Sequence, residues 1–148
     1  MKKILVPIDG STASQNAAAQ ALALAGMYGS EVTFLTVVEI TSELSYDVST
    51  IGTMDYSTMS NILINLKVER EPNMLDTLLQ TLDCKGINTD KKVIIGEAHP
   101  QIVGTAEDGN YDLIVMGHRG LNPLKRIFIG SVAKRVIEDA PCSVLIVK

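Results

Sequence analysis

The sequence predicts an open parallel α/β sheet of five strands with helices on both faces. Five short apolar runs are continuous and rich in β-branched residues, as in strands covered on both sides. Helical patterns separate most of these runs, and right-handed crossovers between parallel strands place helices on both faces of one sheet. A length of 148 residues suits a single domain, residues 1–148, with a core of ordinary size.

The five predicted strands are defined by their apolar runs. They are residues 4–8 (ILVPI), 32–38 (VTFLTVV), 92–96 (KVIIG), 112–116 (DLIVM) and 143–147 (SVLIV). None is long enough to span a bilayer, which takes roughly 20 apolar residues in a helix. The start MKKILVPIDG has a short apolar run broken by proline and lacks the pattern of a signal peptide, so we expect a cytoplasmic protein outside membranes.

The first predicted helix begins after Ser11, a favourable N-cap, and carries a stripe of alanines that allows close packing. The stripe comprises Ala13, Ala17, Ala21 and Ala25, and either Gly26 or Gly29 ends the helix. A helix is also expected over residues 56–85, where Pro72 should kink or split it.

Two further helices follow in the C-terminal half. One covers residues 100–108, and one begins at Ser131 and presents Val132, Val136 and Ala140 on one face. Residues 39–60 show no clean period and form a long connection, for which a functional lid and a disordered segment are equally good interpretations.

Composition excludes several classes of function. The net charge is −4 without a basic tract, so a nucleic acid is not an expected partner. Cys84 and Cys142 lack metal-ligand or redox spacing and are interpreted as small apolar residues. A flavin site is disfavoured by the absence of Trp and by 4% aromatic residues. A phosphate-receiver domain would need clustered acidic residues after the first strand, and these are missing.

Two segments that follow predicted strands carry residues suited to a ligand. In an open parallel sheet, ligands bind beyond the carboxyl ends of strands. PIDGS (7–11) follows the first strand, and MGHRGLNPLKRIFIGSV (116–132) follows the fourth. If these strands are neighbours, both loops line one crevice.

The second segment spaces its glycines for a phosphate. Gly117 and Gly120 would let a ligand approach the backbone, while Gly130 and Ser131 open a helix whose N-terminus attracts anions. The nine residues between these pairs let the loop leave the sheet and return, which favours a polyphosphate. Asp9 would repel phosphate and would instead accept a hydrogen bond from a base amino group or a ribose hydroxyl. Each glycine taken alone would favour an ordinary turn or strand end, and only the joint spacing shifts the balance toward a site.

The spacing Gly-x2-Gly-x9-Gly-Ser, formed here by Gly117, Gly120, Gly130 and Ser131, resembles the ATP-binding signature of the universal stress protein family. The resemblance also covers KKILVPIDGS, YDLIVMGHRG and GSVAKRVIEDAPCSVLIVK. It implies a Rossmann-like strand order 3-2-1-4-5, ATP or AMP as ligand, optional Mg or Mn bound through the phosphates, and a homodimer through residues 142–148. The nucleotide-binding positions that it implies are Pro7, Ile8, Asp9, Val37, Met116, Gly117, His118, Arg119, Gly120, Gly130, Ser131 and Val132.

An enzymatic role has little support in the sequence. His99 and His118 are the only histidines, and no catalytic Ser-His-Asp arrangement can be assigned. No Gly-Lys-Ser/Thr loop is present, so rapid phosphoryl transfer lacks its usual groups. The expected function is that of an ATP-binding, nucleotide-dependent regulator in stress response, with protein partners unidentified. A slow ATPase, autophosphorylation and a ligand-free dimeric interaction module stay open, as does the choice between phosphate and solvent for His118.

Overall fold

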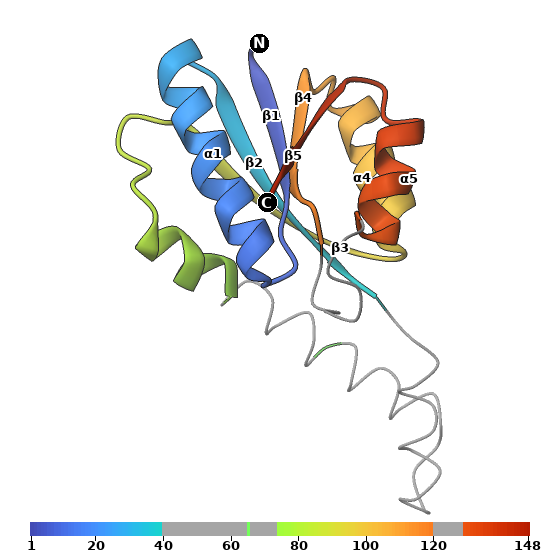
Figure 1. Cartoon of the computed structure of the whole chain (residues 1–148). Coiled ribbons are helices and arrows are strands. Elements are labelled where there is room, and N and C mark those ends of the chain that lie inside the picture. The colour runs from blue at the N-terminus through green and yellow to red at the C-terminus, as the bar shows by residue number, and fades with distance from the viewer. Residues whose placement is uncertain (40–64, 66–73, 120–128) are drawn as a thin grey trace, which may run out of the picture.

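The computed structural model describes residues 1–39, 65, 74–119 and 129–148 (Figure 1). Its strands and helices alternate along most of the chain. They are β1 (Lys3–Pro7), α1 (Thr12–Tyr28), β2 (Glu31–Val38), β3 (Thr89–Ile95), α4 (Ala98–Asp108), β4 (Leu113–Gly117), α5 (Ser131–Asp139) and β5 (Ser143–Val147). Residues 74–81 are also helical. No helix within the described ranges has both the length and the apolar character needed to cross a bilayer.

The five strands form one parallel sheet in the order β3-β2-β1-β4-β5, which confirms the predicted topology. The strand limits differ from the predicted ones by one residue at most, except at β3. This strand begins three residues earlier, because Thr89 to Lys91 pair with Val32 to Phe34. Strand β3 lies at an edge of the sheet, where polar side chains reach water, so its apolar pattern understates its length.

Two hydrophobic cores flank the sheet. In Figure 1, α1 covers one face, and α4 and α5 cover the other. Alternate residues of one strand serve the two cores: Ile4 and Val6 of β1 pack on the α1 side, and Leu5 packs on the α4 and α5 side. Coverage of both faces explains why the central strands are apolar without alternation.

The caps of helix α1 agree with the sequence. The Ser11 hydroxyl accepts a hydrogen bond from the amide of Ser14, and Gly29 ends the helix at φ 64°, which settles the choice between Gly26 and Gly29. Ala17, Ala21 and Ala25 are buried as predicted. These small side chains let the helix approach the sheet closely.

The two C-terminal helices are also close to their predicted positions. Helix α5 begins at Ser131, with Val136 fully buried and Val132 and Ala140 packed against the same core. Helix α4 begins at Ala98, two residues before the predicted start, and its first amide donates to the carboxylate of Glu39. This long-range contact leaves no local signal in the sequence.

Several expectations concern residues outside the described ranges. They include the character of the 39–60 connection beyond Glu39, the effect of Pro72 on the 56–85 helix, and the position of Gly120.

Asp112 is anchored at the amino end of the sheet, opposite the carboxyl ends of the strands. Its Oδ2 accepts hydrogen bonds from the amides of Lys2 at 2.6 Å and Lys3 at 2.9 Å. These amides lower the pKa of the exposed Asp112 carboxyl below its usual value, with smaller help from the N-terminal ammonium and the Lys2 side chain.

Replacing Asp112 with asparagine is expected to destabilise the fold at neutral pH. The free energy of unfolding of the variant should also fall less steeply as the pH is lowered. A carboxyl whose pKa is lower in the folded state contributes stability above its unfolded pKa of about 3.9, and this contribution disappears as the pH falls through the folded value. Urea denaturation at pH 7 and at successively lower pH would measure the effect. A stability gap between wild type and D112N that stays constant with pH would contradict this assignment.

Candidate functional site

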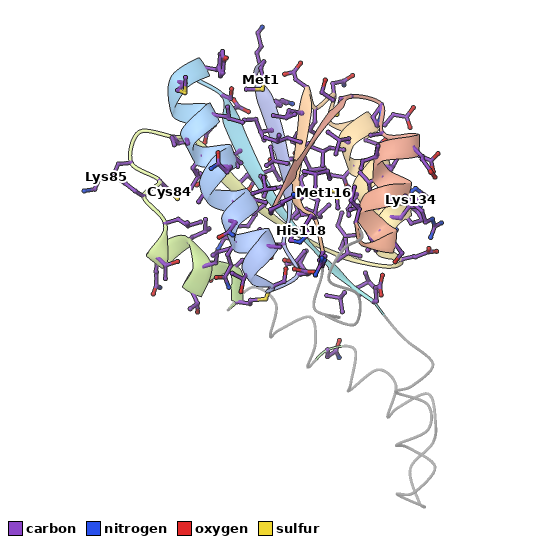
Figure 2. All side chains as sticks on the ribbon, viewed as in Figure 1. Met1, Cys84, Lys85, Met116, His118 and Lys134 are labelled. Carbon is purple, nitrogen blue, oxygen red and sulfur yellow. The ribbon has the colours of Figure 1, made fainter. Side chains whose placement is uncertain are left out.

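The carboxyl ends of β1 and β4 lie side by side at the centre of the sheet. The two strands pair through Ile4 with Leu113 and Leu5 with Ile114. The loop after Pro7 and the loop after Gly117 therefore leave the same edge. Figure 2 shows His118 at this lower edge and Met1 at the opposite end of the molecule. The two segments that carry residues suited to a ligand therefore begin at the same edge, as the sequence predicted.

The loop after β1 forms a tight turn around Asp9. The Asp9 Oδ1 accepts hydrogen bonds from the Ser11 amide at 3.0 Å and from the Ser11 hydroxyl at 2.6 Å. Gly10 between them has φ 82°, a conformation that side chains disfavour. Asp9 is exposed, whereas the side chain of Ile8 is buried in the α1-side core. Of these two predicted positions, only Asp9 has an exposed side chain.

Gly117 has a packing role that the sequence did not reveal. A Cβ added to Gly117 would lie 2.7 Å from the carbonyl carbon of Ala13, 2.8 Å from the Ala13 Cβ and 2.9 Å from the Ser14 amide nitrogen. The start of α1 thus lies directly against the end of β4. Glycine is required here by the helix backbone itself, independently of any ligand.

His118 ties the loop after β4 to the last strand. Its amide donates to the Val147 carbonyl at 2.7 Å, and its Nδ1 lies 3.2 Å from the same oxygen. Because a carbonyl oxygen can only accept, this contact assigns the proton to Nδ1 and leaves Nε2 for another partner. The imidazole is partly buried and held by its Nδ1 side.

Gly130 returns to the end of β4, as the spacing predicts. Its amide donates to the His118 carbonyl at 2.8 Å, although twelve positions separate the two residues in the chain. The start of α5 is thereby fixed beside the loop after β4. The amide of Gly130 itself is occupied by this bond, so any anion at this helix would be bound by the amides that follow.

Three helices begin at this edge, and they differ in the side chains that accept hydrogen bonds from their first backbone amides. Helix α1 has the Ser11 hydroxyl, and α4 has the Glu39 carboxylate on its first amide. Helix α5 follows Gly130, which has no side chain, and within the described ranges no side chain caps its start. A helix start with unoccupied amides and a positive dipole end attracts an anion. Among these three, α5 is the start at which no described side chain meets the first amides.

The other predicted residues are distributed around this arrangement. Met116 is buried at the end of β4, Val37 is partly buried near the end of β2, and Val132 packs against the α4 and α5 side. The backbone carbonyl of Arg119 lies 3.4 Å from the Ser11 hydroxyl. Ser11 is the site residue that the sequence assigned only to helix capping. Its contact with Arg119 is tertiary, whereas its bond with Asp9 is local and is signalled by the DGS turn.

The described residues offer neither an activated thiol nor a cluster of metal ligands. Burial raises the pKa of the Cys84 and Cys142 thiols, which keeps them protonated, and Figure 2 places Cys84 away from His118. No three His, Cys, Asp or Glu side chains gather as a metal site within the described ranges.

The chain is an α/β protein with an open parallel sheet, and the loops after β1 and β4 leave the same carboxyl edge. In proteins of this class, ligands bind beyond that edge. The sequence profile of the universal stress protein family matches residues 1–148. The chain therefore belongs to the universal stress protein family.

Individual relatives agree with this assignment. Universal stress protein MJ0531 of Methanocaldococcus jannaschii is 35% identical over 99% of this chain and 82% of its own length. The solved structure of MJ0577, from the same organism, is 31% identical, covers 99% of this chain and 95% of that chain, and gives a TM-score of 0.81. An Archaeoglobus fulgidus universal stress protein, solved in complex with dAMP, shares the fold at 18% identity and a TM-score of 0.60, with 100% and 98% coverage.

Proposed function

We propose that this protein binds ATP at the carboxyl edge of its sheet and acts as a nucleotide-dependent regulator in stress response. The observation that carries the proposal is the hydrogen bond from the Gly130 amide to the His118 carbonyl. It brings the second half of the glycine motif back to the first, so that the start of α5 lies beside the loop after β4. An adenine nucleotide bound to another protein of this fold, the dAMP complex from A. fulgidus, supports the ligand class.

The ligand would be oriented by charge. Its phosphates would contact the amides of Ser131 and Val132, where the helix dipole is positive, and Asp9 would accept hydrogen bonds from the ribose or the base. The proposed contact set is Pro7, Ile8, Asp9, Val37, Met116, Gly117, His118, Arg119, Gly120, Gly130, Ser131 and Val132. Ile8 would contribute through its backbone, because its side chain is buried.

A divalent cation would be bound through the phosphates. The described residues hold no cluster of three ligands that would retain Mg or Mn alone, whereas a polyphosphate carries the oxygen ligands that Mg prefers. The proposal places this chemistry in the cytoplasm, where ATP is abundant, and assigns no catalytic residue.

Calorimetric titration of the purified protein with ATP and AMP, with and without Mg, tests the proposal. We expect saturable binding with one nucleotide per chain. Analysis of nucleotide released from freshly purified protein would reveal ligand retained from the cell. A protein that neither carries nucleotide nor binds it at millimolar concentration would leave the ligand-free interaction module as the function.

We also propose that β5 mediates a homodimer through residues 142–148. The two edges of the sheet differ in character: β5 is Ser143–Val147 with Leu145 37% exposed, whereas β3 carries Asp90, Lys91 and Lys92. Charged side chains protect an edge against pairing, and an apolar edge strand invites it. The apolar edge favours assembly whether or not nucleotide is bound.

Replacing Leu145 with lysine is expected to weaken the dimer by about tenfold or more, because it places a charge in the pairing surface. Sedimentation equilibrium across micromolar concentrations would measure the dissociation constant. Ile95→Lys, at an exposed position of the opposite edge strand, is the matched control and should leave the mass unchanged. A wild-type protein that sediments as a monomer would refute the dimer.

A further inference from the structure

The Ser11 hydroxyl has three neighbours in two loops and one helix. It accepts from the Ser14 amide at 3.2 Å, and it is within donor distance of Asp9 Oδ1 at 2.6 Å and the Arg119 carbonyl at 3.4 Å. A hydroxyl has one proton to donate, and the shorter contact to a carboxylate is the stronger one. The hydroxyl therefore bonds to Asp9, while Arg119 stays close enough to compete for the same proton.

Both hydrogen bonds to the Asp9 carboxylate are accepted by the same oxygen. Both the amide and the hydroxyl of Ser11 contact Oδ1. No described residue donates a hydrogen bond to Oδ2 of this exposed carboxylate. Ser11 therefore fixes the rotation of the carboxylate through one oxygen and leaves the other oxygen available to a hydrogen-bond donor of a ligand.

We infer that Ser11 is a positioning residue for nucleotide recognition: it holds the Asp9 carboxylate so that Oδ2 accepts from the ribose hydroxyls or the base amino group. The inference rests on the proposed ATP site. Ser11 would act through Asp9 without contacting the ligand. Its value to binding is preorganisation, because a carboxylate already held in one rotamer loses less freedom when the ligand arrives.

The Ser11 hydroxyl has two roles that can be tested separately. As the N-cap of α1, Ser11 affects stability, and as a donor to Asp9 it affects ligand discrimination. Ser14 offers a matched control, because its hydroxyl donates to the Ser11 carbonyl at 2.9 Å in the same turn but lies outside the contacts of Asp9. Threonine at position 11 keeps a hydroxyl able both to cap the helix and to donate, so S11T tests rescue.

The experiment is a titration with ATP, 2′-deoxy-ATP, 3′-deoxy-ATP and inosine triphosphate. Wild type should bind at least one of these analogues more weakly than ATP, since each lacks a donor that Asp9 would accept from. Ser11→Ala should lower ATP affinity about 3- to 10-fold, the size expected for one lost hydrogen bond. It should also reduce the preference for ATP over the analogue that wild type binds more weakly, and Asp9→Ala should have the same effect.

The two substitutions should be non-additive, because Ser11 acts only through Asp9. In a D9A background, S11A should change ATP affinity little. With Asp9 present, S14A should leave the analogue preference intact, and S11T should keep the preference that S11A loses. A stability loss alone would leave this ratio of affinities unchanged in folded protein, so capping cannot imitate the result.

The outcomes distinguish this inference from the proposed function. Wild-type protein that fails to bind ATP would refute the ATP site and the inference with it. Wild type that binds ATP without preference over any of the three analogues would overturn the role of Asp9 and therefore of Ser11. An S11A variant that keeps the full analogue preference would overturn the inference and leave the ATP site standing.

Discussion

Valine at position 130 is expected to lower ATP affinity by roughly 100-fold or more, equivalent to about 2.7 kcal/mol. The proposed phosphate position lies against the start of α5, where Gly130 presents no side chain. A branched side chain there would occupy the space of the ligand and displace it from the free amides. Titration of folded G130V with ATP would measure the loss.

The fold should tolerate this substitution. Gly130 has φ −59° and ψ 153°, an extended conformation that a β-branched residue adopts without strain. Its amide bond to the His118 carbonyl involves only backbone and would persist. We expect Gly130→Ala to have an intermediate effect on affinity. Unchanged ATP affinity in G130V would mean that the glycine only shapes a turn, and the nucleotide proposal would fall.

Alanine at position 117 is expected to destabilise the protein by about 2–3 kcal/mol, the upper part of the range for overpacking. The new Cβ would lie within 3.0 Å of three atoms at the start of α1, two of them backbone. Backbone atoms cannot rotate away as a flexible side chain can, so the helix and the strand must separate. Urea denaturation, with the m-value as a check on two-state behaviour, measures the change.

Two further variants control this result. Gly104→Ala adds a Cβ in open space on α4 and should raise stability by up to about 1 kcal/mol through helix propensity. In an Ala13→Gly background, G117A should cost less, because the contact with the Ala13 Cβ at 2.8 Å is gone while the backbone contacts stay. A G117A protein as stable as wild type would assign this glycine to the ligand.

The two glycines show how far the sequence alone could reach. It placed Gly117 and Gly130 at the same edge of the sheet, because continuous apolar runs identify buried parallel strands and the residues after them must share an edge. It assigned both glycines to the ligand. Only the tertiary structure separates them, since the contact of Gly117 with Ala13 joins positions that are 104 apart in the chain.

The sequence by itself determined where the strands lie, the N-cap of α1 and the start of α5, and it narrowed the end of α1 to Gly26 or Gly29, because these depend on residues that are near one another in the chain. Apolar runs, the N-cap at Ser11 and the αL position at Gly29 all act locally. The tertiary structure decided the contacts between separate segments: the Glu39 carboxylate on α4, the packing that requires Gly117, and the Ser11 hydroxyl between Asp9 and Arg119. Such contacts arise from the distance and direction of groups brought together by folding, and sequence spacing does not encode them.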